Sequence, residues 1–208
     1  MKYSDPITTL FVDIGGVLLT DGWSYEFRQL AVKKFNLISE KMEALHSQAF
    51  ETLELGKITM QEYLKFVVFY EERHFTMERF MDFIFARSES NPKMIELIRQ
   101  LKKKYRLKIV AVSNKARELN AYRIQKFELN EFIDAFVSSC YVGLRKPDPD
   151  IFRLALNIAQ VLPEQVVYIE NTPMFVRVAE DLRINGICHT DYNSTRKQLA
   201  AYGLEVVS

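Results

Sequence analysis

The chain has 208 residues, 48% of them hydrophobic, so it can bury the core of one sizeable domain or of one domain with a small insertion. Lys and Arg number 28 against 27 Asp and Glu, which gives a formal net charge of +1. A chain so close to neutrality has no overall field that attracts nucleic acid or an anionic membrane. We therefore expect neither nucleic acid nor a membrane as a partner. We expect the protein to act as a monomer or a homodimer.

The N-terminal sequence MKYSDPITTL lacks the apolar core of a signal peptide, and no run approaches the roughly 18 apolar residues of a membrane span. Two cysteines, Cys140 and Cys188, lie in apolar surroundings without metal-site spacing. Buried thiols without a disulfide framework are typical of a reducing compartment. These features predict a cytoplasmic protein.

The first strand is predicted at residues 10–12, a short apolar run that ends abruptly at Asp13 and is followed by Gly15 and Gly16. An acid at the carboxyl end of a buried parallel strand lies at the edge where open α/β sheets bind ligands. The glycines let the backbone approach such a ligand closely. Asp13 is therefore the candidate centre of a site, and the alternative is that it only caps the following turn.

The next seventy or so residues have apolar residues at helical spacing. Helices are predicted at residues 23–37, 39–56, 59–74 and 77–89. Ser39 is the expected N-cap of the second helix, and Thr59 with Glu62 fits a capping box at the third. Most of the many aromatic residues here are expected to form the core of a small helical bundle.

From Pro92 onward, helices and strands alternate with short connections. The expected helices cover residues 92–105, 116–127, 151–162, 174–184 and 193–202, and the expected strands cover residues 107–114, 135–139, 166–171 and 186–190. This alternation predicts an α/β fold with a parallel sheet covered on both faces. We predict a core domain of residues 1–19 and 92–208, and an inserted helical cap domain of residues 20–91 that closes over the carboxyl edge of the sheet.

Polar residues follow the predicted strands where those strands end, or lie on a nearby loop. They are Asp13, Ser113, Asn114, Lys146, Glu170 and Asn171. Carboxyl ends of parallel strands meet at one edge, so these side chains are expected to converge. Two carboxylates, a hydroxyl, an ammonium and two amides suit phosphoryl transfer, whose transition state spreads negative charge over its oxygens.

We predict that Asp13 attacks phosphorus and forms an aspartyl phosphate. Ser113 and the backbone amides after Gly15, including that of Gly16, would hold the phosphate oxygens, and Lys146 would offset their charge. Asp13 and Glu170 would supply oxygen ligands to Mg²⁺, which usually takes one or two carboxylates and keeps several waters.

Each residue also has a simpler interpretation. Ser113 and Asn114 could cap a helix, Lys146 could be an ordinary surface lysine, and Glu170 with Asn171 could begin a helix. Their common placement, each where a strand or its loop ends, favours the site.

The segments VDIGGVL, VAVSN, GLRKPDPDIF and VVYIENTP resemble motifs one to four of the haloacid dehalogenase-like (HAD) hydrolase superfamily. The segment after the first motif resembles the helical type 1 cap of its subfamily I, and the resemblance covers nearly the whole chain. It implies a Rossmann-like core, Mg²⁺ dependence and phosphatase activity on small phosphate esters. It assigns Asp13, Ser113, Lys146 and Glu170 the roles given above and adds the Gly15 carbonyl as a metal ligand.

Two departures from the family pattern affect the expected rate. Family phosphatases usually carry a second Asp two positions after the nucleophile, where this chain has Gly15, and loss of a general acid or base costs on the order of 10²- to 10⁴-fold. Asn171 is the predicted metal ligand in motif four where the family usually has an acid. The loss of one negative charge should weaken Mg²⁺ binding. We expect a phosphatase of low to moderate rate that acts on a small phosphorylated metabolite.

Two other functions remain open. The changes at Gly15 and Asn171 favour a non-catalytic binding or regulatory protein with the same fold. A 2-haloacid dehalogenase needs neither a general acid nor a metal, but the dehalogenases have an aromatic residue at the Gly15 position and serines at motif four. Cap residues that enter the pocket would decide the substrate, and the candidates are Arg28, Gly56, Lys57 and Tyr63. The predicted substrate-binding residues are Lys57 in the cap and Gly16 and Asn114 at the sheet edge.

Overall fold

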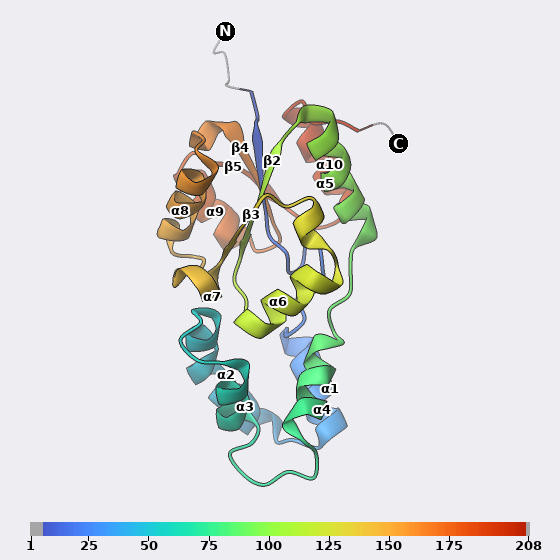
Figure 1. Cartoon of the computed structure of the whole chain (residues 1–208), viewed down its shortest axis with the longest axis vertical. Coiled ribbons are helices and arrows are strands. Elements are labelled where there is room, and N and C mark those ends of the chain that lie inside the picture. Colours follow the sequence, from blue (N-terminus) through green and yellow to red (C-terminus); the bar gives the residue numbers. More distant parts are fainter. Residues whose placement is uncertain (1–5, 207–208) are drawn as a thin grey trace.

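The computed structural model describes residues 6–206 (Figure 1). Within this range, five parallel strands form a sheet in the order β3-β2-β1-β4-β5. The strands are β1 Thr9–Val12, β2 Lys108–Ser113, β3 Ala135–Ser138, β4 Val166–Glu170 and β5 Asn185–Cys188. The predicted α/β fold with a parallel sheet is confirmed, and the first strand lies at its centre.

Helices cover both faces of this sheet (Figure 1). They are α5 Pro92–Tyr105, α6 Arg117–Lys126, α7 Ser139–Val142, α8 Pro149–Ala159, α9 Pro173–Asp181 and α10 Tyr192–Ala201, with short 3₁₀ turns at η1 Leu129–Glu131 and η2 Pro163–Gln165. Successive residues of β1 point to opposite faces. Leu10 and Val12 pack in the hydrophobic cluster that includes α5 and α10, whereas Phe11 packs in the cluster that includes α8 and α9. Burial on both faces explains why β1 is apolar throughout.

Four helices lie beyond the carboxyl edge of the sheet, at the lower end of Figure 1, and we call them the helical segment. They are α1 Tyr25–Phe35, α2 Ser39–Glu54, α3 Met60–Val67 and α4 Met77–Phe85. They have a separate hydrophobic cluster rich in aromatic residues. The division into a core and a cap domain stays a prediction, and residues 1–5 and 207–208 of the predicted core lie outside the described residues.

Helix ends in this segment follow local hydrogen bonds. The capping box of α3 is confirmed, because Glu62 N donates to Thr59 Oγ1 at 3.1 Å and Thr59 N donates to Glu62 Oε2 at 2.8 Å. The prediction for Ser39 is wrong, since the N-cap of α2 is Ile38. Ser39 Oγ instead donates to Gln29 Oε1 at 3.0 Å.

The third helix is shorter than predicted, since α3 ends at Val67 and not near residue 74. The chain beyond it brings Phe69 and Phe75 together, with ring centroids 5.5 Å apart, and Phe75 packs on Phe35 at 4.6 Å. Aromatic packing therefore outweighs the helical spacing of the sequence in this stretch.

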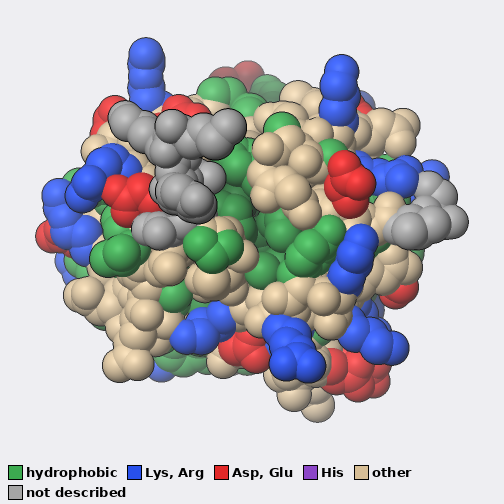
Figure 2. Space-filling view, turned by 90° about the horizontal axis from the view of Figure 1, so that it is seen from above, with side chains coloured by type: hydrophobic (Ala, Val, Ile, Leu, Met, Phe, Trp, Pro, Cys, Tyr) green, Lys and Arg blue, Asp and Glu red, His purple; other side chains and the backbone are tan. Residues whose placement is uncertain are grey.

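Figure 2 shows the end of the molecule opposite the helical segment. Acidic and basic side chains are interspersed on this face, as the nearly neutral net charge leads us to expect. In the described part of the chain, no helix is long and apolar enough to cross a membrane. Cys140 is buried, which raises the pKa of its thiol to about 11, whereas Cys188 is only partly buried; both are free.

The aromatic core of the helical segment can be tested at Phe80. This residue is fully buried, and its ring centroid lies 4.7 Å from Phe35 and 5.8 Å from Phe75. We expect Phe80→Ala to lower the free energy of unfolding in urea by about 3–5 kcal/mol, because it leaves a cavity. Phe66→Ala is the control, since Phe66 is 44% exposed, and we expect a loss below about 1 kcal/mol. Equal losses would contradict the packed core.

Candidate active site

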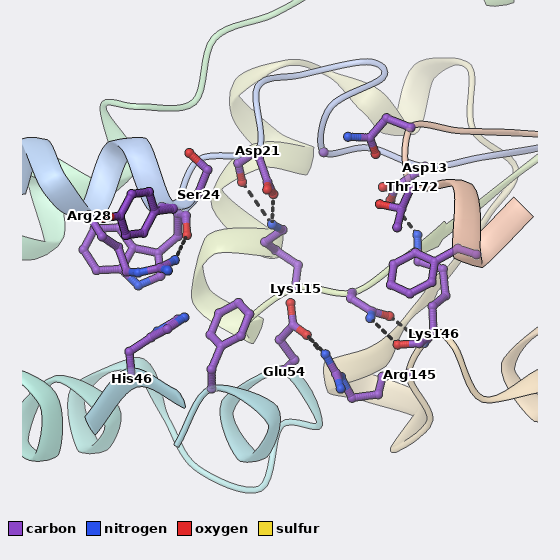
Figure 3. A pocket seen from close by; sticks show the side chains of 17 residues that line it. Asp13, Asp21, Ser24, Arg28, His46, Glu54, Lys115, Arg145, Lys146 and Thr172 are labelled. Carbon is purple, nitrogen blue, oxygen red and sulfur yellow. Dashed lines mark hydrogen bonds and ion pairs between the residues drawn. The ribbon is translucent and has the colours of Figure 1, made fainter. Parts of the chain in front are cut away.

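The carboxyl ends of β1, β2 and β4 meet beside a cavity of about 400 Å³, whose lining comes from this edge and from the helical segment (Figure 3). The sheet register places Val12 opposite Ala111 on one side and Ile169 on the other. Asp13, directly after β1, therefore lies between the ends of the two neighbouring strands.

Asp13 is anchored through one of its two carboxylate oxygens. Oδ1 accepts a hydrogen bond from Ile14 N at 2.8 Å and lies 3.2 Å from Lys146 Nζ. Across residues 6–206, no group bonds Oδ2. Burial raises the pKa of Asp13 to about 6, although the nearby Lys146 ammonium lowers it. A fixed carboxylate with one free oxygen is suited to nucleophilic attack.

Lys146 is buried, with 1% of its surface exposed, so the alternative of an ordinary surface lysine is wrong. Its Nζ lies 2.6 Å from Glu170 Oε2 and 3.2 Å from Asp13 Oδ1. Burial lowers the pKa of Lys146, but the two carboxylates outweigh burial and raise the pKa overall. The structure thus brings together three of the residues predicted from the sequence.

Glu170 is fully buried and does not line the cavity. Besides the bond to Lys146, its Oε2 accepts from the Tyr168 hydroxyl at 2.5 Å, and its Oε1 accepts from Thr172 N at 2.8 Å. This arrangement holds Lys146 in place. The neighbouring Asn171 lines the cavity instead, and a metal-binding role of Glu170 stays a prediction.

Asn114 lines the cavity and fixes the backbone of Lys146. Asn114 Nδ2 donates to Lys146 O at 2.9 Å, and Asn114 Oδ1 accepts from Lys146 N at 2.9 Å. Ser113, at the end of β2, is buried and is not among the residues that line the cavity. Neither residue is the N-cap of α6, which is Ala116.

Gly16 serves the turn after β1 and not directly the cavity. Its φ is +78°, and a Cβ there would lie 2.2 Å from Asn171 Nδ2, so a side chain would displace Asn171. Its N–H donates to Leu19 O at 2.7 Å, so this amide, predicted to hold phosphate, already has a partner. Lys57, the predicted substrate-binding residue, is exposed and lies outside the cavity lining.

The oxygen donors that face the cavity fit a hydrated divalent cation. Asp13 offers a carboxylate, Asn171 an amide oxygen and Gly15 a backbone carbonyl, and all three residues line the cavity. Mg²⁺ usually takes one or two carboxylates and keeps several waters. In the part of the chain that the structure describes, no group of three or more His, Cys, Asp or Glu could hold a metal ion, so a cation here would depend on the amide and carbonyl oxygens and on water.

A second carboxylate, that of Asp21, lies beside Gly15. A Cβ on Gly15 would be 3.1 Å from Asp21 Oδ1 and 3.6 Å from Lys115 Nζ. Lys115 Nζ donates to Asp21 Oδ1 at 2.9 Å (Figure 3), and the charge of Lys115 lowers the pKa of Asp21. Neither residue is among the candidates predicted from the sequence, although Lys115 directly follows Ser113 and Asn114.

Helix α2 contributes one face to the cavity, with His46, Phe50 and Glu54 spaced four residues apart. This spacing is visible in the sequence and could have identified them. Glu54 Oε2 accepts from Arg145 Nη2 at 2.8 Å, and Arg145 directly precedes Lys146. The core and the helical segment are therefore joined by an ion pair at the cavity.

Four cap residues are candidates for substrate selection, and of these, within the described residues, Arg28 lines the cavity. Its guanidinium bonds Glu43 at 2.8 Å and the carbonyl of Trp23 at 2.9 Å. Gly56 and Tyr63 do not line the cavity. The charge of Arg28 is thus already paired.

Solved structures with the same fold include HAD family enzymes. A HAD family enzyme from Bacteroides thetaiotaomicron superposes with a TM-score of 0.77 at 21% identity, over 89% of this chain and 94% of that one. Another structure of that enzyme holds magnesium and inorganic phosphate, with a TM-score of 0.73 at 20% identity over 88% of this chain and 94% of that one. A HAD-like family hydrolase from Porphyromonas gingivalis has a TM-score of 0.74 at 21% identity, over 93% and 98% of the two chains.

Similar curated proteins include the bifunctional epoxide hydrolase 2 of Sus scrofa, which is 23% identical over 90% of this chain and 37% of that protein. A phosphorylated carbohydrates phosphatase of Thermotoga maritima is 30% identical over 49% of this chain and 48% of that protein. The chain thus spans less than half the length of these two relatives. The family model for haloacid dehalogenase-like hydrolases matches residues 7–180, so the chain belongs to this hydrolase family.

Proposed function

We propose that the protein is a Mg²⁺-dependent phosphatase that hydrolyses a small phosphorylated metabolite through an aspartyl phosphate on Asp13. The observation that carries this proposal is the free Oδ2 of Asp13, which is held at the cavity by the buried Lys146–Glu170 pair. Two relatives support it: the Thermotoga maritima protein is named a phosphatase, and the Bacteroides thetaiotaomicron enzyme has been solved with magnesium and phosphate.

The proposed reaction has two displacements at phosphorus. Asp13 Oδ2 first attacks the phosphorus of the ester, the bond from phosphorus to the ester oxygen breaks, and the departing alkoxide takes a proton from solvent water. Water then attacks phosphorus, the bond to Asp13 breaks, and phosphate leaves with the carboxylate regenerated. Lys146 offsets negative charge at both steps, and the Ser113 hydroxyl is proposed to hold a phosphate oxygen.

Asp13, the Gly15 carbonyl and Asn171 would hold Mg²⁺, which supplies positive charge next to the phosphoryl oxygens when bound. We assign proton transfer to Asp21, since Gly15 has no side chain to perform it. Lys115 lowers the pKa of Asp21, so Asp21 is charged at neutral pH and can accept a proton from the attacking water, but only as a weak base. No residue is assigned as the general acid that would protonate the departing alcohol, which fits a low to moderate rate.

Replacing Asp13 tests the nucleophile. We expect Asp13→Asn to lower Mg²⁺-dependent phosphate release from sugar and nucleotide phosphates on the order of 10³-fold or more, because the amide does not form the aspartyl phosphate. Asp181→Asn, at an exposed position in α9, is the matched control and should keep the full rate. Circular dichroism and the melting temperature should show that both variants are folded.

The same panel separates the other functions. Halide release from 2-haloacids without metal would identify a dehalogenase. If the wild-type protein releases no phosphate from any ester but still binds phosphate, it is a binding protein. An Asp13→Asn variant with unchanged rate would contradict the nucleophile.

Replacing Asp21 tests the proton acceptor. On p-nitrophenyl phosphate we expect Asp21→Ala to release one equivalent of nitrophenol in a burst and then to turn over about 10²- to 10⁴-fold more slowly, because only the second step lacks its base. Gly15→Asp in the Asp21→Ala background should restore at least part of the steady rate, since the added carboxylate enters the vacated space. An unchanged steady rate in Asp21→Ala would exclude the assignment.

The metal is tested by removal and by a change of charge. We expect EDTA to abolish phosphate release and added Mg²⁺ to restore it. Asn171→Asp should lower the dissociation constant for Mg²⁺, measured by titration calorimetry, by about tenfold, because it adds a second carboxylate to the proposed metal ligands. Activity that is insensitive to EDTA would contradict the metal requirement.

A further inference from the structure

A buried chain of hydrogen bonds lies behind the cavity wall of the helical segment. Trp23 Nε1 donates to Tyr63 Oη at 3.0 Å, and Tyr63 Oη lies 2.7 Å from His46 Nδ1. All three side chains are buried, with exposures of 4% for Trp23, 0% for Tyr63 and 7% for His46. The proposed function does not use this chain.

The direction of these bonds follows from the chemistry of the three groups. An indole N–H can only donate, so the Tyr63 oxygen accepts from Trp23. Burial raises the pKa of Tyr63, so the hydroxyl keeps its proton. Among the described residues, His46 Nδ1 is the acceptor within hydrogen-bond distance of this hydroxyl, which favours a hydrogen bond donated by Tyr63 to His46. His46 Nδ1 is then the acceptor, and the ring carries its hydrogen on Nε2.

The surroundings keep His46 uncharged. Burial and, to a smaller extent, the positive charge of Arg28 on α1 lower the pKa of His46 to about 4, although Glu43 on α2 acts in the opposite direction. A charged imidazole would also direct an Nδ1–H at the Tyr63 hydroxyl proton. His46 therefore presents one donor, Nε2–H, at neutral pH.

His46 lines the cavity, across from Asp13 in Figure 3. Among residues 6–206, no group bonds its Nε2. The charges nearby are already paired, Arg28 with Glu43 and Arg145 with Glu54, and the Phe50 ring lies 4.4 Å from the His46 ring centroid. This wall therefore offers an uncharged donor next to an aromatic ring.

We propose that His46 is a specificity-determining residue whose Nε2–H donates to an uncharged oxygen on the alcohol part of the substrate. The inference rests on the proposed function and narrows it to phosphate esters of a neutral, hydroxyl-bearing alcohol without a second anionic group. Tyr63 and Trp23 are positioning residues, because they fix which ring nitrogen carries the hydrogen.

The state of His46 can be measured without any turnover. The chain has three histidines, His46, His74 and His189, so ¹⁵N spectra of the imidazoles can be assigned by substitution. We expect His46 to hold its hydrogen on Nε2 from pH 8 to about 5, and Tyr63→Phe to populate the other tautomer. A hydrogen on Nδ1 in the wild-type protein, or a titration midpoint near 6.5, would overturn the proposal.

Ligand selection tests the donor role. Glucose 6-phosphate has neutral hydroxyls and phenyl phosphate has none, so both are added to Asp13→Asn protein with His46, His46→Gln or His46→Leu. We expect His46→Leu to weaken glucose 6-phosphate binding by about tenfold and to leave phenyl phosphate unchanged, and His46→Gln, which keeps an N–H, to lose less. Equal losses on both ligands, or no loss on either, would overturn the proposal.

Different results would contradict the proposed phosphatase and the proposed substrate class. Absence of phosphate release from every ester by the wild-type protein would defeat the proposed phosphatase, whereas selective binding through His46 would still be seen in the variants. Phosphate release with no ligand preference at His46 would defeat only the substrate class.

Discussion

The buried ammonium of Lys146 is the constraint on which the site depends. An unpaired charge in the protein interior is strongly unfavourable, and breaking a buried pair typically costs about 3–5 kcal/mol. Lys146 is therefore stable in its position only because Asp13 and Glu170 lie within 3.2 Å and 2.6 Å of its Nζ. The loop that carries Lys146 and the ends of β1 and β4 are thereby held in one arrangement.

Further hydrogen bonds hold Glu170 and the backbone of Lys146 in place. Tyr168 and the Thr172 amide also donate to Glu170, and Asn114 holds the backbone of Lys146. Glu170 is buried behind Lys146 and does not line the cavity, whereas Asp13 lines the cavity and has one oxygen that no described group bonds. The structure separates the residue that reacts from the residues that orient it.

The two walls of the cavity differ in charge. At the sheet edge, charged groups converge on the place proposed for a phosphoryl group. On the helical wall, Arg28 is paired with Glu43, Glu54 is paired with Arg145 of the core, and burial keeps His46 neutral. A cavity with one charged and one neutral wall favours a ligand with one anionic end.

The sequence by itself determined the parallel sheet, the succession of strands and helices along the chain, and the convergence of Asp13, Lys146 and Glu170. Strand periodicity and the placement of polar residues at strand ends are local properties of the sequence. Only the tertiary structure decided that Asp21 and Lys115 lie beside Gly15, that the Gly16 amide donates to Leu19, and that His46 Nδ1 faces the Tyr63 hydroxyl. These features depend on partners far apart in the chain, or on competition for a single donor, and no local pattern records such pairings.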